Sequence, residues 1–241
     1  MNDTKSILVV DDDEDIAANM NDILSDMGYR VDVAHNGETA LSHLTRKAYD
    51  IALLDYKMPD VDGATLFSQM KLLQPGLAAI MITAFANSED VRRATSNGVT
   101  NVLRKPVDLP QLFESIADVC DRPLVLIIDD DDDFSHSLED ILREHNYRVG
   151  RATDVAQANE CLATLRFDVV VLDLRLGNHT AEKIQFGGNQ WPTAILTTGY
   201  TSEMSSLIKL LQERGVKAVH RKPVDTDDLL RDVSNVAQSA R

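Results

Sequence analysis

Short apolar runs alternate with longer amphipathic stretches along the chain. In the first half the apolar runs are rich in Val, Ile and Leu, and they predict five strands, at residues 6–10, 30–35, 50–55, 78–83 and 100–104. Most of these runs are continuously apolar, which is typical of strands buried on both faces in a parallel sheet. The stretches between them predict helices. One of these, residues 14–27, ends before Gly28 and carries an apolar stripe of Ile16, Met20, Ile23, Leu24 and Met27.

The second half of the chain repeats the first. The run "ILVVDDDED" reappears as "LVLIIDDDDDF", and Asp129 lies 118 positions after Asp11. Three more blocks match in the same order at offsets of 118, 115 and 117 residues: "YDIALLDYK" with "FDVVVLDLR", "IMITAF" with "ILTTGY", and "VLRKPVD" with "VHRKPVD". Four matched blocks at a nearly constant offset indicate two copies of one domain. We place the domains at residues 1–121 and 122–241, since Pro123 does not easily extend a preceding helix.

The predicted elements bring polar side chains to one edge of each sheet. Strands that alternate with helices predict an α/β fold, and five strand–helix units fit each copy, so we expect two doubly wound domains with parallel sheets. Ligands of such sheets bind beyond the carboxyl ends of the strands. In the first copy these ends carry Asp11, Asp12, Asp55 and Thr83, and Lys105 follows the fifth strand.

The three carboxylates at this rim require a positive partner. Carboxylates held so close repel one another unless a cation lies between them. The set offers oxygen ligands without His or Cys, which favours a hard cation, and a partly hydrated Mg²⁺ suits a shallow site with few carboxylates. We therefore expect Mg²⁺ as the cofactor.

Composition narrows the classes of function. The 241 residues carry a formal net charge of −15 and the pI is about 4.7, so direct binding of nucleic acid is not expected, because an acidic surface repels phosphate. Cys120 and Cys161 form no disulfide framework, and residues 1–6 lack the pattern of a secretory signal. No apolar run reaches the roughly 18 residues of a membrane span. We expect a cytoplasmic protein without membrane insertion.

In this order, and present twice, the motifs resemble the receiver domain of two-component response regulators, the family that includes the chemotaxis receivers. The likeness covers both copies and implies a flavodoxin-like (βα)5 fold with strand order 2-1-3-4-5 in each. In the first copy it implies that Asp55 is the phosphoacceptor and that Mg²⁺ is held by Asp12, Asp55 and the backbone carbonyl of Lys57. Asp11 would act on the metal through water.

The resemblance gives roles to two further residues of the first copy. Lys105 would pair with the phosphoryl oxygens, and Thr83 would donate a hydrogen bond to the acyl phosphate. The peptide bond before the proline that follows the lysine is commonly cis in the family. The second copy offers the same set, with Asp173 as acceptor and Arg175 as the source of the carbonyl: Asp129, Asp130, Asp173, Arg175, Thr198 and Lys222. The remaining acidic residues of both clusters are interpreted as charges at helix starts: Asp13, Glu14 and residues 131–133.

Both copies depart from the family pattern. Val102 and Val219 stand three residues before the lysines, where receivers usually carry Tyr or Phe, so the usual coupling between the threonine and an aromatic ring is not expected. After its acceptor the second copy replaces "DYKMPDVDG" with "DLRLGNHTA". We expect a short, poorly patterned third helix after this stretch, broken by Gly187-Gly188, and a different recognition of partners.

The resemblance implies a response regulator with two receiver domains and no output domain in this chain. It would accept a phosphoryl group from a sensor histidine kinase or a phosphotransfer protein, and would signal by contact with a downstream protein target or by phosphorelay. A homodimer is a further hypothesis. No enzymatic activity is expected beyond self-phosphorylation and autodephosphorylation.

Three alternatives stay open. In the first, the chain is the receiver part of a longer signalling protein. In the second, the two copies bind partners independently of phosphorylation. The third is a Mg²⁺-dependent phosphatase of the haloacid dehalogenase type, whose nucleophile ends the first strand in a DxD pattern that Asp11-x-Asp13 fits. The duplication and the matches at Asp55 and Lys105 argue against this phosphatase.

Overall fold

The chain forms two compact units. The structure is a computed structural model that describes residues 4–84, 92, 94–95, 98–186, 193–199 and 204–239. The units are Met1–Arg122 and Pro123–Arg241. The division between them lies one residue after the division expected from the sequence.

The first unit is built on a five-stranded parallel sheet. Its strands are β1 (Ser6–Val10), β2 (Arg30–Ala34), β3 (Ile51–Asp55), β4 (Ala78–Thr83) and β5 (Asn101–Arg104). They pair in the order β2-β1-β3-β4-β5, and every pairing is parallel. The three central strands are buried along their whole length, as their continuously apolar sequences predict. The predicted fold class and strand order are confirmed for this unit.

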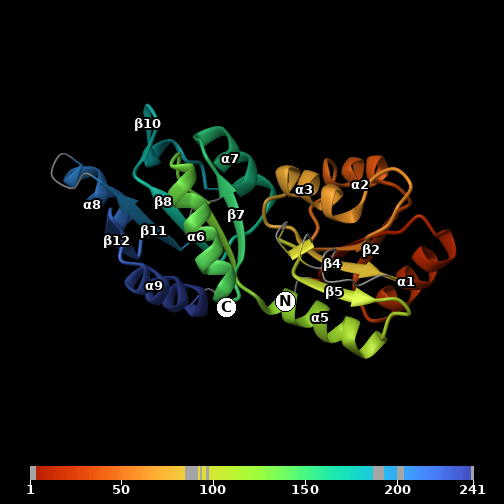
Figure 1. Cartoon of the computed structure of the whole chain (residues 1–241). Coiled ribbons are helices and arrows are strands. Elements are labelled where there is room, and N and C mark those ends of the chain that lie inside the picture. Colours follow the sequence, from red (N-terminus) through yellow and green to blue (C-terminus); the bar gives the residue numbers. More distant parts are fainter. Residues whose placement is uncertain are drawn as a thin grey trace. The chain divides into compact units, whose positions relative to one another are not determined.

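Helices cover both faces of this sheet (Figure 1). The described helices are α1 (Glu14–Asp26), α2 (Gly37–Leu44), α3 (Gly63–Leu73) and α5 (Leu109–Asp121). The apolar side chains of α1 and α5 pack on one face, and those of α2 and α3 pack on the other. All four helices begin with an Asp or Asn side chain that accepts a hydrogen bond from a backbone N–H of the first turn, as is usual for an N-cap.

The predicted apolar stripe of α1 is correct in its middle and wrong at its ends. Met20 and Leu24 are buried, together with Ala17, which the stripe omitted. Ile16 is 38% exposed and Met27 is 57% exposed. Ile16 lies in the first turn of α1 and Met27 is its C-cap, so both lie at the limits of the sheet that the helix covers.

The second unit repeats the architecture of the first. Its main strands are β6 (Leu124–Ile128), β7 (Arg148–Ala152), β8 (Val169–Asp173), β11 (Ala194–Thr198) and β12 (Ala218–Arg221). They form a parallel sheet of order β12-β11-β8-β6-β7, which is again 2-1-3-4-5 counted within the unit. Helices α6 (Asp132–Glu144) and α9 (Thr226–Ser239) pack on one face, and α7 (Val155–Thr164) and α8 (Ser205–Glu213) pack on the other.

The units differ in the segment that follows β3 in the first and β8 in the second. Within residues 174–186 the structure describes no α-helix; it has an antiparallel hairpin of β9 (Arg175–Leu176) and β10 (His179–Thr180), then a single 3₁₀ turn at Ala181–Lys183. The hairpin corresponds to the loop 57–62 of the first unit, and the 3₁₀ turn stands where α3 begins. The expected third helix is therefore not seen within residues 181–186, and its expected break at Gly187-Gly188 lies outside the described residues. The turn of the hairpin is Gly177-Asn178, in which Gly177 has a φ of 58°, a left-handed conformation that suits glycine.

The residue that follows this loop or hairpin also differs between the units: it is Gly63 in the first and Ala181 in the second. Gly63 begins α3, and a Cβ atom added there would lie 2.5 Å from the backbone oxygen of Asp55. The equivalent residue, 118 positions later, is the buried Ala181. Because Ala181 carries a Cβ, its segment does not reproduce the close approach that Gly63 makes.

Candidate functional site

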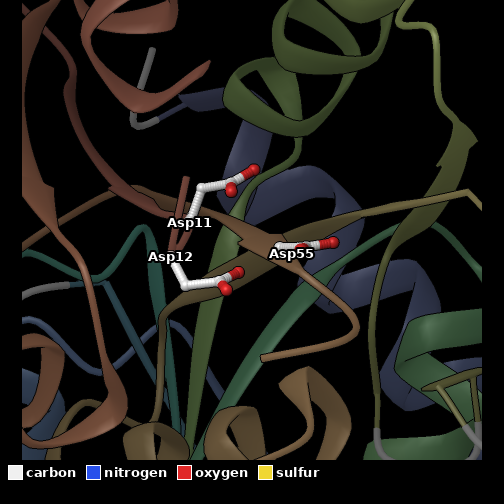
Figure 2. A group of neighbouring side chains, drawn as sticks. All are labelled: Asp11, Asp12 and Asp55. Carbon is white, nitrogen blue, oxygen red and sulfur yellow. The ribbon is translucent and has the colours of Figure 1, made fainter. Parts of the chain in front are cut away.

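Three carboxylates meet at the carboxyl end of the first sheet (Figure 2). Asp11 and Asp12 follow β1, and Asp55 ends the neighbouring strand β3. Asp11 and Asp55 are buried, with 4% and 8% exposed, whereas Asp12 is exposed. One oxygen of each carboxylate lies within 4.8 Å of the others. The spacing brings together the three acidic residues that the sequence analysis placed at one rim.

Lys105 supplies a positive charge between two of these carboxylates. Its Nζ donates to Asp11 Oδ2 at 2.8 Å and lies 3.3 Å from Asp55 Oδ2. The backbone N–H of Lys105 donates to the Thr83 carbonyl at 2.8 Å, which fixes the start of the lysine to the end of β4. The Lys105–Pro106 bond is cis, as expected, and so is Lys222–Pro223.

The electrostatics of this cluster follow from its burial. Burial raises the pKa of the Asp55 carboxyl, the charge of Asp11 adds to this effect, and Lys105 and the backbone N–H of Lys57 oppose it. Burial alone would lower the pKa of Lys105, but the hydrogen bonds and charges of Asp11 and Asp55 outweigh it and raise that pKa. The lysine therefore stays charged, while burial disfavours the ionised form of Asp55.

Thr83 and Lys57 lie where the sequence analysis placed them. Thr83 is the last residue of β4 and is 3% exposed, and Asp55 pairs with the residue just before it, Ile82. Lys57 is exposed and forms an isolated antiparallel bridge with Asp62 directly after β3. The role of the Lys57 carbonyl as a metal ligand remains a prediction.

Asp13 does not belong to the cluster. Its side chain is the N-cap of α1 and accepts from the backbone N–H groups of Asp15 and Ile16. Its own N–H donates to Asp11 Oδ1 at 3.0 Å, which orients Asp11. The N-cap role accounts for Asp13 without a catalytic function, so the structure adds no support to the phosphatase alternative.

The second unit contains an equivalent cluster. Asp129, Asp130 and Asp173 place one carboxylate oxygen each within 4.8 Å of the others. Lys222 Nζ donates to Asp129 Oδ2 at 2.7 Å and to Asp173 Oδ2 at 2.6 Å, so it contacts both carboxylates closely. Thr198 ends β11, is 2% exposed, and accepts a hydrogen bond at its carbonyl from the Lys222 N–H.

The same physical causes shift the pKa values in this second cluster. Burial raises the pKa of Asp129, and the charge of Asp173 adds to it, against the opposing effects of Lys222 and the Asp131 N–H. The hydrogen bonds and charges of Asp129 and Asp173 raise the pKa of Lys222 although burial would lower it. Lys222 is thus a charged partner of two buried carboxylates.

Three contacts of the second cluster were not expected from the sequence. Gly177 N–H donates to Asp130 Oδ2 at 3.0 Å, and Arg175 N–H donates to Asp173 Oδ1 at 3.1 Å. Lys222 Nζ lies 4.7 Å from the centroid of the Phe134 ring, a cation–π contact. The Gly177-Asn178 dipeptide is a sequence signal for a hairpin, and so for the turn that brings the Gly177 N–H to Asp130. The ring contact joins residues far apart in sequence and had no such signal.

Both clusters fit a hard divalent cation. Each offers three carboxylates and no nitrogen or sulfur ligand, which matches the preference of Mg²⁺ for oxygen. In both, a lysine pairs with two of the three carboxylates, so the described groups of each cluster keep a net negative charge. An arrangement of this kind is able to bind a cation and a phosphoryl group around one nucleophilic carboxylate.

The two valines that replace the usual aromatic residue are half-buried. Val102 packs against the core on the α2–α3 face of the first sheet, and Val219 packs against the equivalent core of the second. Neither side chain is large enough to alternate between a buried and an exposed ring position. None of the described helices is long and apolar enough to cross a membrane.

Comparison with known proteins identifies relatives of both halves. The response regulator receiver domain matches twice, over residues 7–117 and 125–234. A response regulator receiver protein of Anaeromyxobacter sp. (strain Fw109-5) is 30% identical over 232 residues, which cover 95% of this chain and 94% of that protein. The transcriptional regulatory protein GlrR of Escherichia coli (strain K12) is 34% identical over 48% of this chain, but only 26% of its own length is covered.

A solved structure is similar to half of the chain. It is a CheY-like response regulator receiver domain protein from Methanospirillum hungatei JF-1, with 33% sequence identity and a TM-score of 0.46. The match covers 48% of this chain and 93% of that one.

Proposed function

The chain belongs to the response regulator receiver family, of which it carries two domains in tandem, and on this premise we propose that it accepts phosphoryl groups on Asp55 and Asp173. The observation that carries the proposal is that one constellation occurs twice: a strand-end acceptor, two acidic neighbours and a lysine whose backbone N–H makes the same hydrogen bond in both units. Duplication alone would repeat any ion pair, but the constellation is kept in the second unit although the segment that follows its acceptor has been rebuilt.

The chemistry follows from the position of each group. A carboxylate oxygen of Asp55 attacks phosphorus, and the bond from phosphorus to the nitrogen of a phosphohistidine donor breaks. Lys105, which faces Asp55 at 3.3 Å, balances the charge of the transferred phosphoryl oxygens. Thr83, at the end of β4, donates its hydroxyl hydrogen to the acyl phosphate. In the second unit Asp173, Lys222 and Thr198 act in the same way.

We assign Mg²⁺ as the cofactor of both sites. Asp12, Asp55 and the Lys57 carbonyl would hold it in the first, with Asp11 acting through water. Asp130, Asp173 and the Arg175 carbonyl would hold it in the second, with Asp129 acting through water. When bound, the ion neutralises charge on the transferring group. The protein's own contribution is to hold the carboxylates together before the ion arrives.

The partners follow from this role. The donor is a sensor histidine kinase or a phosphotransfer protein in the cytoplasm, and the output is contact with a target protein or onward transfer of the phosphoryl group. A sensor kinase, RcsC of Salmonella typhi, is 36% identical over half of this chain, which supports kinase-dependent signalling as the setting.

Phosphorylation with a small donor tests the proposal. The wild type, Asp55→Asn, Asp173→Asn and the double variant are incubated with acetyl phosphate and Mg²⁺, and the mass of each intact protein is measured. Because the amide keeps the shape of the carboxylate but is not a nucleophile, each single variant should lose one phosphoryl adduct and the double variant both. Labelling of the double variant at the wild-type level would show that the acceptor lies elsewhere, and no labelling of the wild type would favour a phosphorylation-independent module.

A further inference from the structure

The segments that follow the two acceptors align without a gap. Residues 55–63 correspond to 173–181, and both segments close with the same backbone hydrogen bond. In the first unit Gly63 N–H donates to the Tyr56 carbonyl at 2.8 Å, and in the second Ala181 N–H donates to the Leu174 carbonyl at 3.1 Å. The two sites can therefore be compared residue by residue.

One position within these segments changes what the backbone can donate. The first unit has Pro59, which has no N–H, and the second has Gly177 in its place. Gly177 uses its N–H to donate to Asp130 Oδ2 at 3.0 Å. The equivalent bond to Asp12 is chemically excluded in the first unit. Hydrogen bonds to ionised carboxylates are stronger than neutral ones, so this contact is a substantial difference between the sites.

The hairpin of the second unit holds two of the three carboxylates. Arg175 N–H donates to the acceptor Asp173, and Gly177 N–H donates to Asp130. The first of these bonds has a counterpart in the first unit, where the Lys57 N–H bonds to Asp55, but the second has none. A hairpin with two residues in each strand is marginal by itself, so its order depends on such contacts.

We propose that Gly177 is a positioning residue of the second site: its N–H ties Asp130 to the hairpin, so that Mg²⁺ binding and hairpin order reinforce each other in the second receiver only. The inference rests on the proposed function, because it takes Asp130 as a metal ligand. Hydrogen bonds to the ligands of a metal orient them, and the loss of such a partner typically lowers metal affinity by about 10–100-fold.

The coupling is reciprocal. If the ordered hairpin raises Mg²⁺ affinity by a given factor, then bound Mg²⁺ favours the ordered hairpin by the same factor. Saturating Mg²⁺ should therefore slow hydrogen exchange of the Gly177 amide by at least about tenfold, on the lower bound of the affinity change. In this way occupancy of the second site would be displayed on the hairpin 175–180, of which the first unit has only the Lys57–Asp62 bridge.

Three variants separate the N–H from the shape of the turn. Gly177→Pro removes the N–H and restores the residue of the first unit, but it also fixes φ at about −65°, away from the 58° of Gly177. Replacing Gly177 with glycolic acid turns its amide into an ester, which removes the N–H and leaves φ free; this ester variant should lose Mg²⁺ affinity as Gly177→Pro does. Gly177→Asn is the matched control, because Asn keeps the N–H and tolerates a φ near 58°. A side chain at this position meets open space, since a Cβ atom there has no neighbour within 4 Å.

Mg²⁺ titrations of the ¹⁵N-labelled full chain give a separate reading of each site. The Gly63 amide reports on the first site, and the equivalent Ala181 amide reports on the second. Gly177→Pro should raise the Mg²⁺ concentration for half-saturation at Ala181 by about tenfold or more. It should leave the Gly63 response unchanged, and Gly177→Asn should behave as the wild type.

The outcomes distinguish the positioning role of Gly177 from the proposed function of the chain. Equal Mg²⁺ affinity at Ala181 in the ester variant and in the wild type would overturn the positioning role while the proposed function stood, whatever Gly177→Pro does. Faster exchange of the Gly177 amide with Mg²⁺ would overturn it as well, since the metal would then break the bond. No Mg²⁺ response at either reporter would overturn the metal-dependent function and this inference with it.

Discussion

Replacing Lys105 with Met should destabilise the first unit in the absence of divalent cations. Methionine keeps the length of the side chain but leaves Asp11 and Asp55, both buried, without their positive partner. With an effective dielectric constant of about 20, contacts of 2.8 Å and 3.3 Å correspond to gross attractions of about 6 and about 5 kcal/mol. Most of this is offset by the desolvation of the three groups.

The net effect is smaller than these gross attractions. Breaking a buried ion pair by removal of one partner costs about 3–5 kcal/mol. The side chain of Lys105 is 20% exposed, so we expect a loss near the lower limit, about 3 kcal/mol. Millimolar Mg²⁺ should recover part of it, because the ion supplies the missing positive charge and binds only the folded protein.

Urea unfolding followed by two probes measures this loss. Far-UV circular dichroism follows both units, whereas the single tryptophan of the sequence, Trp191, belongs to the second half. Lys105→Met should move the dichroism transition of the first unit and leave the fluorescence transition in place. Lys5→Met is the control, since Lys5 pairs with Asp50 at 3.2 Å with 39% and 28% of the side chains exposed, and should cost less than about 1 kcal/mol. Equal effects of the two substitutions, with EDTA present, would refute the account of the cluster.

Three further outcomes are expected. Mg²⁺ should raise the melting temperature of the first unit in the wild type and much less in Asp12→Ala, because Asp12 is a proposed ligand; identical shifts in calorimetry would contradict this. Gly63→Ala should cost about 1–3 kcal/mol, because its Cβ would lie 2.5 Å from the Asp55 carbonyl oxygen, whereas the control Gly199→Ala meets open space; equal urea midpoints would exclude the clash. The pKa of Asp55 is raised from 3.8 in the folded state, so folding favours its protonated form and its contribution to stability is lost as the pH rises through the folded-state pKa. Without metal, Asp55→Asn should therefore gain stability relative to the wild type between about pH 4 and pH 7, and a parallel pH dependence of the two proteins would contradict the raised pKa.

The sheets were predictable because their signal is local and repeated. The continuously apolar runs that end in Asp11 and Asp55 predicted buried parallel strands, and β1 and β3 have those limits to within one residue. The equivalence of the two halves then placed Asp173 at the end of the strand that is observed as β8.

The features that the sequence did not predict depend mainly on contacts between residues that are distant in the chain. Buried Gln74 donates to the carbonyls of Leu44 and Lys47 and accepts from the Tyr49 N–H, which no local pattern announces. The hairpin of the second unit had a local signal, the Gly177-Asn178 step, but the expectation of another strand–helix unit outweighed it. Repetition in a sequence predicts a shared architecture better than it predicts the places where one copy has been rebuilt.

The outer strands of the two sheets bear on how the chain avoids misassembly. Tandem copies of one fold hold four sheet edges at high local concentration, and exposed edges invite pairing between the wrong strands during folding. Each of the outer strands β2, β5, β7 and β12 carries at least one arginine, and none is as uniformly buried as the central strands. A charged side chain has to be desolvated before another strand can dock beside it, so these arginines disfavour edge-to-edge aggregation. An apolar substitution such as Arg104→Val would therefore compromise solubility and refolding yield before it compromised either acceptor site.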